Sequence, residues 1–253
     1  MKLILDTTKS LEENATSYFE KSKKAKNKIG GIEKTIELSK KKMHFEEKRN
    51  EEQKKEEQKK YLEPPSKKWY MKFRWFTSSD GFLCIGGRDA TTNEMLIKKH
   101  TEKRDLVFHT DLAGSPFFVI KAEGKEIPQT TKEETAQATA SFSRAWNQSL
   151  TTAEVYAIAP DQVKKELGLP KGAFMIHGKR EYFKPIVKLY IGINKENYIE
   201  CSPLKKEFLL KQEGKKTDTA KQLQQKFIEK INIKFSVDEI MQALPGDCSI
   251  DIQ

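Results

Sequence analysis

Long apolar runs are missing from this sequence of 253 residues. No stretch approaches the roughly 18 apolar residues that cross a bilayer. The opening MKLILDTTKS has too short an apolar run for a secretory signal peptide. We therefore expect a soluble protein of the cytoplasm.

Cysteine is scarce as well. Cys84, Cys201 and Cys248 are far apart in the chain, form no CxxC pair and show no metal-ligand spacing. An odd number of isolated cysteines favours a reducing compartment over a disulfide framework. His100 and His177 supply no third ligand that would complete a metal site with His109. We expect neither a metal nor a cofactor.

Signatures of catalysis are also absent. Nothing in the chain fits a Walker motif or GxGxxG, and Ser115 follows Gly114 without the GxSxG pattern of a nucleophile elbow. His109 and Asp111 would be the catalytic pair of a nuclease or hydrolase, which is the enzymatic alternative. A single histidine at a strand end beside an aspartate is more often a structural hydrogen-bonding pair. We therefore expect a protein that is not an enzyme.

What the chain has in excess is charge. Charged residues make up 33% and apolar residues 36%, and 47 Lys and Arg against 37 Asp and Glu give a net charge of +10. A uniform globule would carry less charge, so the charge is expected to concentrate in a segment without its own core. The excess of positive charge indicates an anionic partner, either nucleic acid or an anionic membrane surface. A basic protein without such a partner is the alternative.

Residues 9–62 are rich in Lys and Glu and contain no proline. Ser10-Leu11-Glu12-Glu13 is a capping box, which predicts a helix start. After it, residues recur in steps of four and three as a heptad seam, namely Leu11, Ala15, Tyr18, Ser22, Ala25, Ile29, Ile32, Ile36, Ser39 and Met43. A helix of about 50 residues, roughly 75 Å long, would leave this seam in water. The seam therefore predicts a partner helix, with Leu11, Tyr18, Ile29, Ile32, Ile36 and Met43 at the contact.

Gly30-Gly31 lies inside the seam and is open to two interpretations, a kink or a hairpin turn. The seam keeps its phase across the glycines, which favours a continuous helix. Beyond it, charge pairs such as Glu51/Lys55 and Glu56/Lys60 replace the apolar residues. Pro64-Pro65 should end this segment, so residues 1–65 are expected to form a coiled-coil helix.

Residues 66–192 predict a compact α+β domain, in which a small mixed or antiparallel sheet packs against helices. An Asp-Gly turn at residues 80–81 joins the first strand pair, and a capping box at Thr131 should open a helix that runs to about Trp146. Strands are expected at 73–76, 81–85, 105–110, 117–122, 155–159, 173–176 and 186–191, with helical character at 92–99. Residues 193–253 predict a helical C-terminal tail, with helices near 219–231 and 237–244.

Aromatic and basic residues alternate between Trp69 and Lys121. Lysine and arginine neutralise phosphates, which makes the following residues candidates for nucleic-acid binding: Lys72, Arg74, Arg88, Lys98, Lys99, Lys121, Lys179 and Arg180. Exposed aromatics would stack on unpaired bases. Strand alternation places about half of them inside, so Phe73 and Trp75 are expected in the core or at a domain junction.

Gly86-Gly87-Arg88-Asp89 resembles a turn that cradles phosphate, because glycine lets backbone amides approach an anion closely. A purely structural turn, with Arg88 held by a carboxylate, is the other interpretation. The structural framework of this region is predicted to consist of Gly86, Gly87, Asp89, Asn93, His109, Asp111 and Gly114.

Several separated motifs resemble one family in order. KFRWFTSSDGFLCIGGRDATTNEMLIKKH, DLVFHTDLAGSPFFVIK and GAFMIHGKR are similar to the NFACT-R domain of NFACT proteins, as is the helix ending Ser143-Arg144-Ala145-Trp146. The resemblance covers roughly residues 66–192. Upstream, LDTTKSLEENATSYFEKSKKAKNK resembles the start of the second arm of that family's coiled coil, and EIMQALPGD is similar to the ending of archaeal members.

The resemblance implies a role in ribosome-associated quality control. Members of the family bind large ribosomal subunits obstructed by peptidyl-tRNA and help recruit tRNA, so that C-terminal tails mark the stalled chain. Their NFACT-N domain, helix-hairpin-helix region and first coiled-coil arm have no counterpart in these residues, so tail elongation is not carried over. We expect a fragment of a longer protein whose seam faces the missing arm. A protein–protein scaffold that dimerises through the seam, without RNA specificity, is the alternative.

Overall fold

The computed structural model describes residues 4–57, 61–112 and 114–251, without the side chains of residue 48 and residues 50–57. The chain divides into two units, Met1–Lys60 and Tyr61–Gln253. Within the described residues, no helix combines the length and the apolar character that a bilayer crossing requires.

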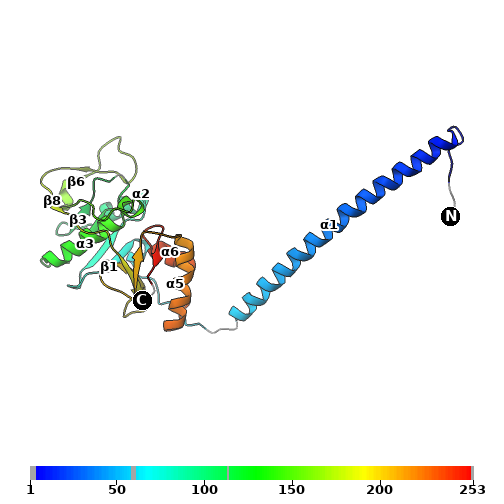
Figure 1. Cartoon of the computed structure of the whole chain (residues 1–253). Helices are drawn as coiled ribbons and strands as arrows, with labels where there is room; N and C mark the ends of the chain where they lie inside the picture. Colours follow the sequence, from blue (N-terminus) through cyan, green and yellow to red (C-terminus); the bar gives the residue numbers. More distant parts are fainter. Residues whose placement is uncertain (1–3, 58–60, 113, 252–253) are drawn as a thin grey trace. The chain divides into compact units, whose positions relative to one another are not determined.

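The first unit holds one helix, α1 (Leu11–Glu57), which runs without a break through Gly30 and Gly31 (Figure 1). The predicted capping box is confirmed, because the Glu13 N–H donates to Ser10 Oγ (3.1 Å) and the Ser10 N–H donates to Glu13 Oε2 (2.8 Å). The helix is thus continuous at the glycines, and the hairpin turn is not formed. The predicted pairs Glu51/Lys55 and Glu56/Lys60 fall on side chains outside the described residues.

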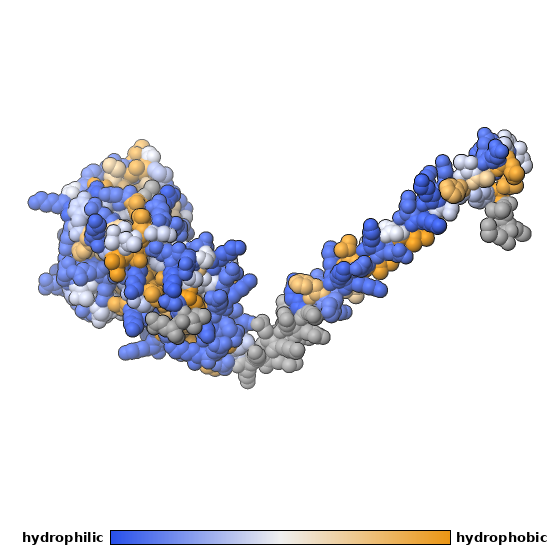
Figure 2. Space-filling view, in the orientation of Figure 1, coloured by the Kyte–Doolittle hydropathy of each residue, from blue (hydrophilic) through white to orange (hydrophobic). Residues whose placement is uncertain are grey.

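The seam of α1 is open to solvent within its unit. Leu11 is 77% exposed, Ile32 is 58% exposed and Met43 is 63% exposed. Figure 2 shows apolar patches spaced along a helix that is otherwise hydrophilic. Tyr18 is half-buried, since its hydroxyl donates to the Ile4 carbonyl (2.6 Å) near the start of the helix.

The second unit is built on a six-stranded antiparallel sheet with the strand order β1-β2-β4-β3-β5-β8. Its strands are β1 (Arg74–Thr77), β2 (Leu83–Gly86), β3 (Leu106–His109), β4 (Phe118–Ile120), β5 (Val155–Ile158) and β8 (Glu181–Phe183). The predicted hairpin is confirmed, with Trp75 opposite Ile85 and Gly81 in the left-handed region at a φ of 83°. The α+β class is confirmed as well.

Helices cover both faces of this sheet, so its strands alternate between two cores. Phe73, Trp75 and Ile85 pack with Leu96 of α2 (Ala90–Lys99) on one face. Phe76 and Phe118 pack on the other face with α3 (Gln129–Ser141), whose small Ala136, Ala138 and Ala140 allow a close approach. The prediction that Phe73 and Trp75 are core residues is confirmed.

The predicted helix from Thr131 to Trp146 is wrong at both ends. Helix α3 begins at Gln129 after Pro128, and no side chain caps it. The Thr131 hydroxyl donates instead to Asp80 Oδ2 (2.8 Å) in the β1–β2 turn. A separate helix, α4 (Arg144–Asn147), starts where Ser143 Oγ accepts from the Ala145 N–H (3.1 Å). Local capping by serine therefore divides a stretch that composition alone predicts as one helix.

Short elements connect the sheet to the rest of the unit. They are η1 (Trp69–Lys72), η2 (Pro160–Gln162) and the hairpin of β6 (Val163–Lys164) with β7 (Met175–Ile176). The expected strand at 173–176 is therefore only two residues long. The expected strand at 186–191 is shifted, because β9 spans Tyr190–Ile193.

Residues 193–253 are not only helical. The helices α5 (Lys216–Ile231) and α6 (Val237–Ala243) confirm that part of the prediction. However, β10 (Ile199–Ser202), β11 (Phe208–Lys211) and β12 (Ser249–Ile250) join β9 in a second antiparallel sheet, in the order β10-β9-β11-β12. These strands were missed because they have only two to four residues, too few for a periodic pattern to distinguish a strand from a loop.

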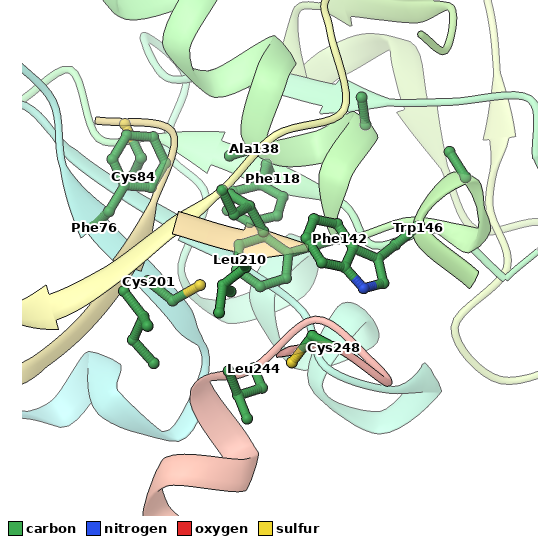
Figure 3. Packing of buried hydrophobic residues seen from close by; sticks show 14 of the residues in the cluster. Phe76, Cys84, Phe118, Ala138, Phe142, Trp146, Cys201, Leu210, Leu244 and Cys248 are labelled. Carbon is green, nitrogen blue, oxygen red and sulfur yellow. The ribbon is translucent and has the colours of Figure 1, made fainter. Parts of the chain in front are cut away.

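The C-terminal segment shares the core of the first sheet. Figure 3 shows Phe142 and Trp146 beside Leu210, Leu244 and Cys248, which come from the last quarter of the chain. The Trp146 Nε1–H donates to the Asp247 carbonyl (2.9 Å). Cys84, Cys201 and Cys248 are buried in the unit as free thiols. Residues beyond 192 therefore form a wall of the core.

Candidate nucleic-acid interface

A cleft of about 550 Å³ lies within the second unit, and we name it the arginine cleft. Three stretches of chain meet there: residues 87–90 at the start of α2, the β3–β4 connection at 109–112 and 114–117, and the β6–β7 connection at 171–176. Side chains from other elements complete the wall, namely Arg74, Asn93, Phe142, Tyr156 and Arg180. The cleft thus gathers residues that are about 100 positions apart in the sequence.

The glycines of the GGRD turn serve close packing. A Cβ atom on Gly87 would lie 1.8 Å from Asn93 Oδ1, and one on Gly86 would lie 2.5 Å from the Phe118 ring. The Asn93 side chain is held there because its Oδ1 accepts from the Phe117 N–H (3.1 Å). Asp89 caps α2 by accepting from the Thr92 N–H (2.8 Å), and this hydrogen bond lowers the pKa of Asp89. These contacts account for the conformation of the turn without a bound anion.

Arg88 is held by oxygen atoms that carry no formal charge, and not by a carboxylate as in the structural interpretation of the turn. Its guanidinium donates to the carbonyls of Met71 (3.0 Å) and Phe73 (2.9 Å) and to Gln242 Oε1 (2.6 Å). The Nε–H is buried and has no partner within the described residues. Burial lowers the pKa of Arg88. Arg88 therefore links η1 and α6 while its charge is not neutralised.

Arg74 is a second arginine without a counter-ion. Its guanidinium donates to the Leu244 carbonyl (3.2 Å) and lies 4.3 Å from the centre of the Phe142 ring. Burial is the main cause that lowers the pKa of Arg74 to about 10, and the positive charge of Arg88 acts in the same direction. Within the described part of the chain, no carboxylate pairs with either arginine. Within the described residues, the cleft wall therefore carries two arginines that form no direct ion pair.

His109 is half-buried in the wall of the cleft. Its ring stacks on Phe117 at a centroid distance of 4.1 Å, and its nitrogens lie 3.3 Å from Tyr156 Oη and 3.3 Å from the Ser115 carbonyl. Burial lowers the pKa of His109 to about 4, so the ring is neutral near pH 7. The carbonyl can only accept, so Nε2 carries the hydrogen and Nδ1 accepts from the tyrosine hydroxyl.

Asp111 does not orient His109. Arg180 Nη1 donates to Asp111 Oδ1 (3.3 Å), and the Arg180 guanidinium lies 4.4 Å from the centre of the Tyr156 ring. The side-chain contacts described for His109 are those with Tyr156 and Phe117, which gives it a structural role. Among the described residues, no three His, Cys, Asp or Glu side chains are grouped to hold a metal. The geometry does not assemble the catalytic pair that the enzymatic alternative requires.

Lys121 is buried, and acidic side chains engage its ammonium group. Its side chain is 8% exposed, and its Nζ contacts Asp105 Oδ2 (2.5 Å), Glu102 Oε1 (3.0 Å) and the His100 carbonyl (3.1 Å). The Asp105 side chain is 1% exposed. Lys121 is therefore corrected from a candidate RNA contact to half of a buried ion pair.

The other predicted basic residues lie on the surface outside the cleft lining. Lys98 pairs with Glu94 (2.6 Å), and Lys72 lies 5.1 Å from the centre of the Phe73 ring. Lys99 and Lys179 are exposed. Of the aromatics near the N-terminal end of the sheet, Trp69 is 51% exposed and stacks on His100 at 4.7 Å.

Sequence reasoning did not single out Lys171, Phe174 or Tyr156 as site residues, although all three line the cleft. The signal for the first two is the Pro-Lys-Gly turn before an aromatic residue. Gly172 has a φ of 77°, and a Cβ on it would lie 2.6 Å from the Ala90 backbone. This glycine therefore brings Lys171 and Phe174 against the start of α2.

Apart from Arg180, every residue that lines the cleft falls within residues 72–178, which match the family described as the NFACT protein RNA binding domain. The second unit therefore contains a domain of this family. Similarity to curated proteins extends beyond the domain. The archaeal Rqc2 homolog aRqcH of Methanocaldococcus jannaschii is 41% identical over 204 residues, which cover 73% of this chain and 29% of that protein.

Two animal proteins are similar to this chain as well. The ribosome quality control complex subunit NEMF homolog of Drosophila melanogaster is 32% identical over 75% of this chain and 19% of its own length. The ribosome quality control complex subunit NEMF of Homo sapiens is 32% identical over 68% of this chain and 16% of its own length. This chain belongs to the NFACT family. It spans less than a third of the length of these relatives.

Proposed function

We propose that this chain is the RNA-binding module of a ribosome-associated quality-control factor. In this proposal it binds tRNA or rRNA on obstructed large ribosomal subunits in the cytoplasm and helps to tag stalled nascent chains. It does so by binding and not by catalysis. The names of its relatives support the setting, and the arginine cleft supports the activity.

The observation that carries the proposal is the charge of the cleft. Its lining includes four cationic side chains, Arg74, Arg88, Lys171 and Arg180, against two acidic ones, Asp89 and Asp111. Both acids are engaged, since Asp89 caps α2 and Asp111 pairs with Arg180. The lining therefore keeps an excess of positive charge for an RNA phosphate, and within the described residues Arg74 and Arg88 form no ion pair. The exposed Lys72, Lys98, Lys99 and Lys179 are proposed to make outer contacts.

The test is the affinity for tRNA across a series of salt concentrations. Each neutralised phosphate contributes about 0.7 to 0.9 to the slope of log affinity against log salt, so four contacts give a slope of about −3. Replacing both Lys171 and Arg180 by Gln should reduce the magnitude of the slope by about 1.5. Arg104 is exposed and lies outside the cleft, so Arg104→Gln is the matched control. Affinity that is independent of salt, or absent at about 50 mM salt, refutes the proposal.

The exposed seam of α1 favours a second candidate function, a protein–protein scaffold. An apolar stripe on a helix of about 70 Å requires a partner helix, either the other arm of a longer protein or a second copy. Light scattering of Ile32→Asp tests this idea, with Lys34→Asp as a control away from the seam. A dimer that dissociates only with Ile32→Asp and has no RNA affinity would establish the scaffold. A monomer at high concentration excludes the second copy.

A further inference from the structure

We propose that the arginine cleft holds one unpaired nucleotide of the RNA, an inference that rests on the proposed function. The phosphate lies at Arg74 and Arg88, and the base lies on the side that carries His109 and Phe174. The inference names what the site selects, a single-stranded nucleotide instead of the shape of a duplex.

The proposed position of the phosphate is supported by hydrogen-bond donors of Arg74 and Arg88 that have no described acceptor. A guanidinium has five N–H groups, and only one acceptor, the Leu244 carbonyl, is described for Arg74. The buried Arg88 Nε–H has no partner within the described residues. Buried cations are costly unless they are paired, and a phosphate would supply both the charge and the acceptors that these two arginines lack.

Residues outside the matched domain position this end of the cleft. The Leu244 carbonyl and Gln242 Oε1 hold Arg74 and Arg88 by hydrogen bonds of 3.2 and 2.6 Å. Gln242 lies near the end of α6 and Leu244 directly follows it, both beyond residue 178 where the family match stops. Helix α6 is therefore a positioning element for the two arginines.

The proposed position of the base is supported by planar side chains that are partly exposed. Phe174 is half-buried and meets Phe117 edge-on at 5.5 Å, and His109 is half-buried and neutral near pH 7. The Arg180 guanidinium lies 4.4 Å from the centre of the Tyr156 ring and adds a cationic group on this side. Unpaired RNA bases stack on aromatic rings and on arginine planes. These groups suit a base that has left its helix.

The size of the cleft supports a single nucleotide. A volume of about 550 Å³ falls inside the roughly 300–1,000 Å³ of pockets that enclose small ligands. In a duplex the bases are stacked inside and only the backbone and groove edges are presented. A duplex would therefore contact the rim of the cleft and leave its interior empty.

The experiment measures fluorescence anisotropy with three probes of one sequence: a single strand, a blunt duplex, and the duplex with one unpaired 3′ nucleotide. We expect the single strand and the overhang to bind at least tenfold more tightly than the blunt duplex. Arg74→Met and Phe174→Ala should each abolish that preference, while Arg104→Gln should keep it. Thermal melting checks that each variant is folded. If Arg74→Met does not fold, Gln242→Ala tests the phosphate end through the anchor of Arg88, since Gln242 is exposed.

The outcomes separate the inference from the proposed function. Equal affinity for all three probes, with a steep salt dependence, overturns the inference and leaves RNA binding intact. A preference for unpaired nucleotides that survives both Arg74→Met and Phe174→Ala overturns it as well, because the preference then arises elsewhere. Absence of binding to every probe refutes the proposed function itself.

Discussion

Replacing Lys121 by methionine should destabilise the second unit strongly. Methionine keeps the length of the apolar stem and removes the ammonium group. The Asp105 carboxylate, 1% exposed, would keep the N–H groups of Glu102 (2.8 Å) and Ala122 (2.9 Å) but lose its counter-ion. An unpaired buried charge of this kind costs about 3–5 kcal/mol. For a unit of this size 1 kcal/mol corresponds to roughly 2–4 °C, so the melting temperature should fall by roughly 6–20 °C.

Calorimetry and urea titration measure this loss. The exposed Lys125 offers a matched control, and Lys125→Met should change the free energy of unfolding by less than about 0.5 kcal/mol. Adding Asp105→Asn to Lys121→Met removes the stranded charge and should recover a large part of the loss. If Lys121→Met melts at the wild-type temperature, the buried pair does not act as argued. Lost tRNA affinity with unchanged stability would instead restore Lys121 as an RNA contact.

Two further changes test the cleft wall. The pKa of His109 is lowered to about 4 in the folded protein, against about 6.5 in the unfolded chain. The neutral ring therefore stabilises the fold fully above about pH 6.5, and this contribution to the free energy of unfolding is lost as pH falls towards 4. Melting curves from pH 7.5 to 4 should show a loss of up to about 3 kcal/mol that His109→Gln removes. Gly87→Ala should cost roughly 2–4 kcal/mol of unfolding free energy, because its Cβ would displace Asn93 from the Phe117 amide. Gly31→Ala, with open space around it, should instead raise the helicity of α1 in circular dichroism.

The elements that the sequence predicted are those with local signals. The Asp-Gly turn placed the β1–β2 hairpin, and two-residue alternation placed Phe73 and Trp75 in the core. The capping box at Ser10 placed the start of α1. In each case the contacts that decide the structure join residues close in sequence, so the local sequence pattern is enough to predict them.

The remaining features depend on partners far away in the chain. Whether Lys121 faces solvent is decided by Asp105, on the other side of a strand pair, and not by its own charge. Arg88 finds its partners at Met71, Phe73 and Gln242. Strand β12 has two residues, and its position is set by β11 and not by its own pattern. Charge composition thus indicated an anionic ligand, and only the fold separated available cations from engaged ones.

The hydrogen bond from Trp146 to the Asp247 carbonyl joins residues 101 positions apart. Because Cys248 and Ile250 belong to the same core as Phe76, that core cannot close until the ribosome has synthesised β12. Pairings of such long range fold slowly and leave apolar surface open in the meantime. One face of the first sheet therefore stays uncovered after its own strands have been synthesised, until β12 is available. A protein proposed to act on stalled translation would then itself depend on translation passing residue 250 before it can fold.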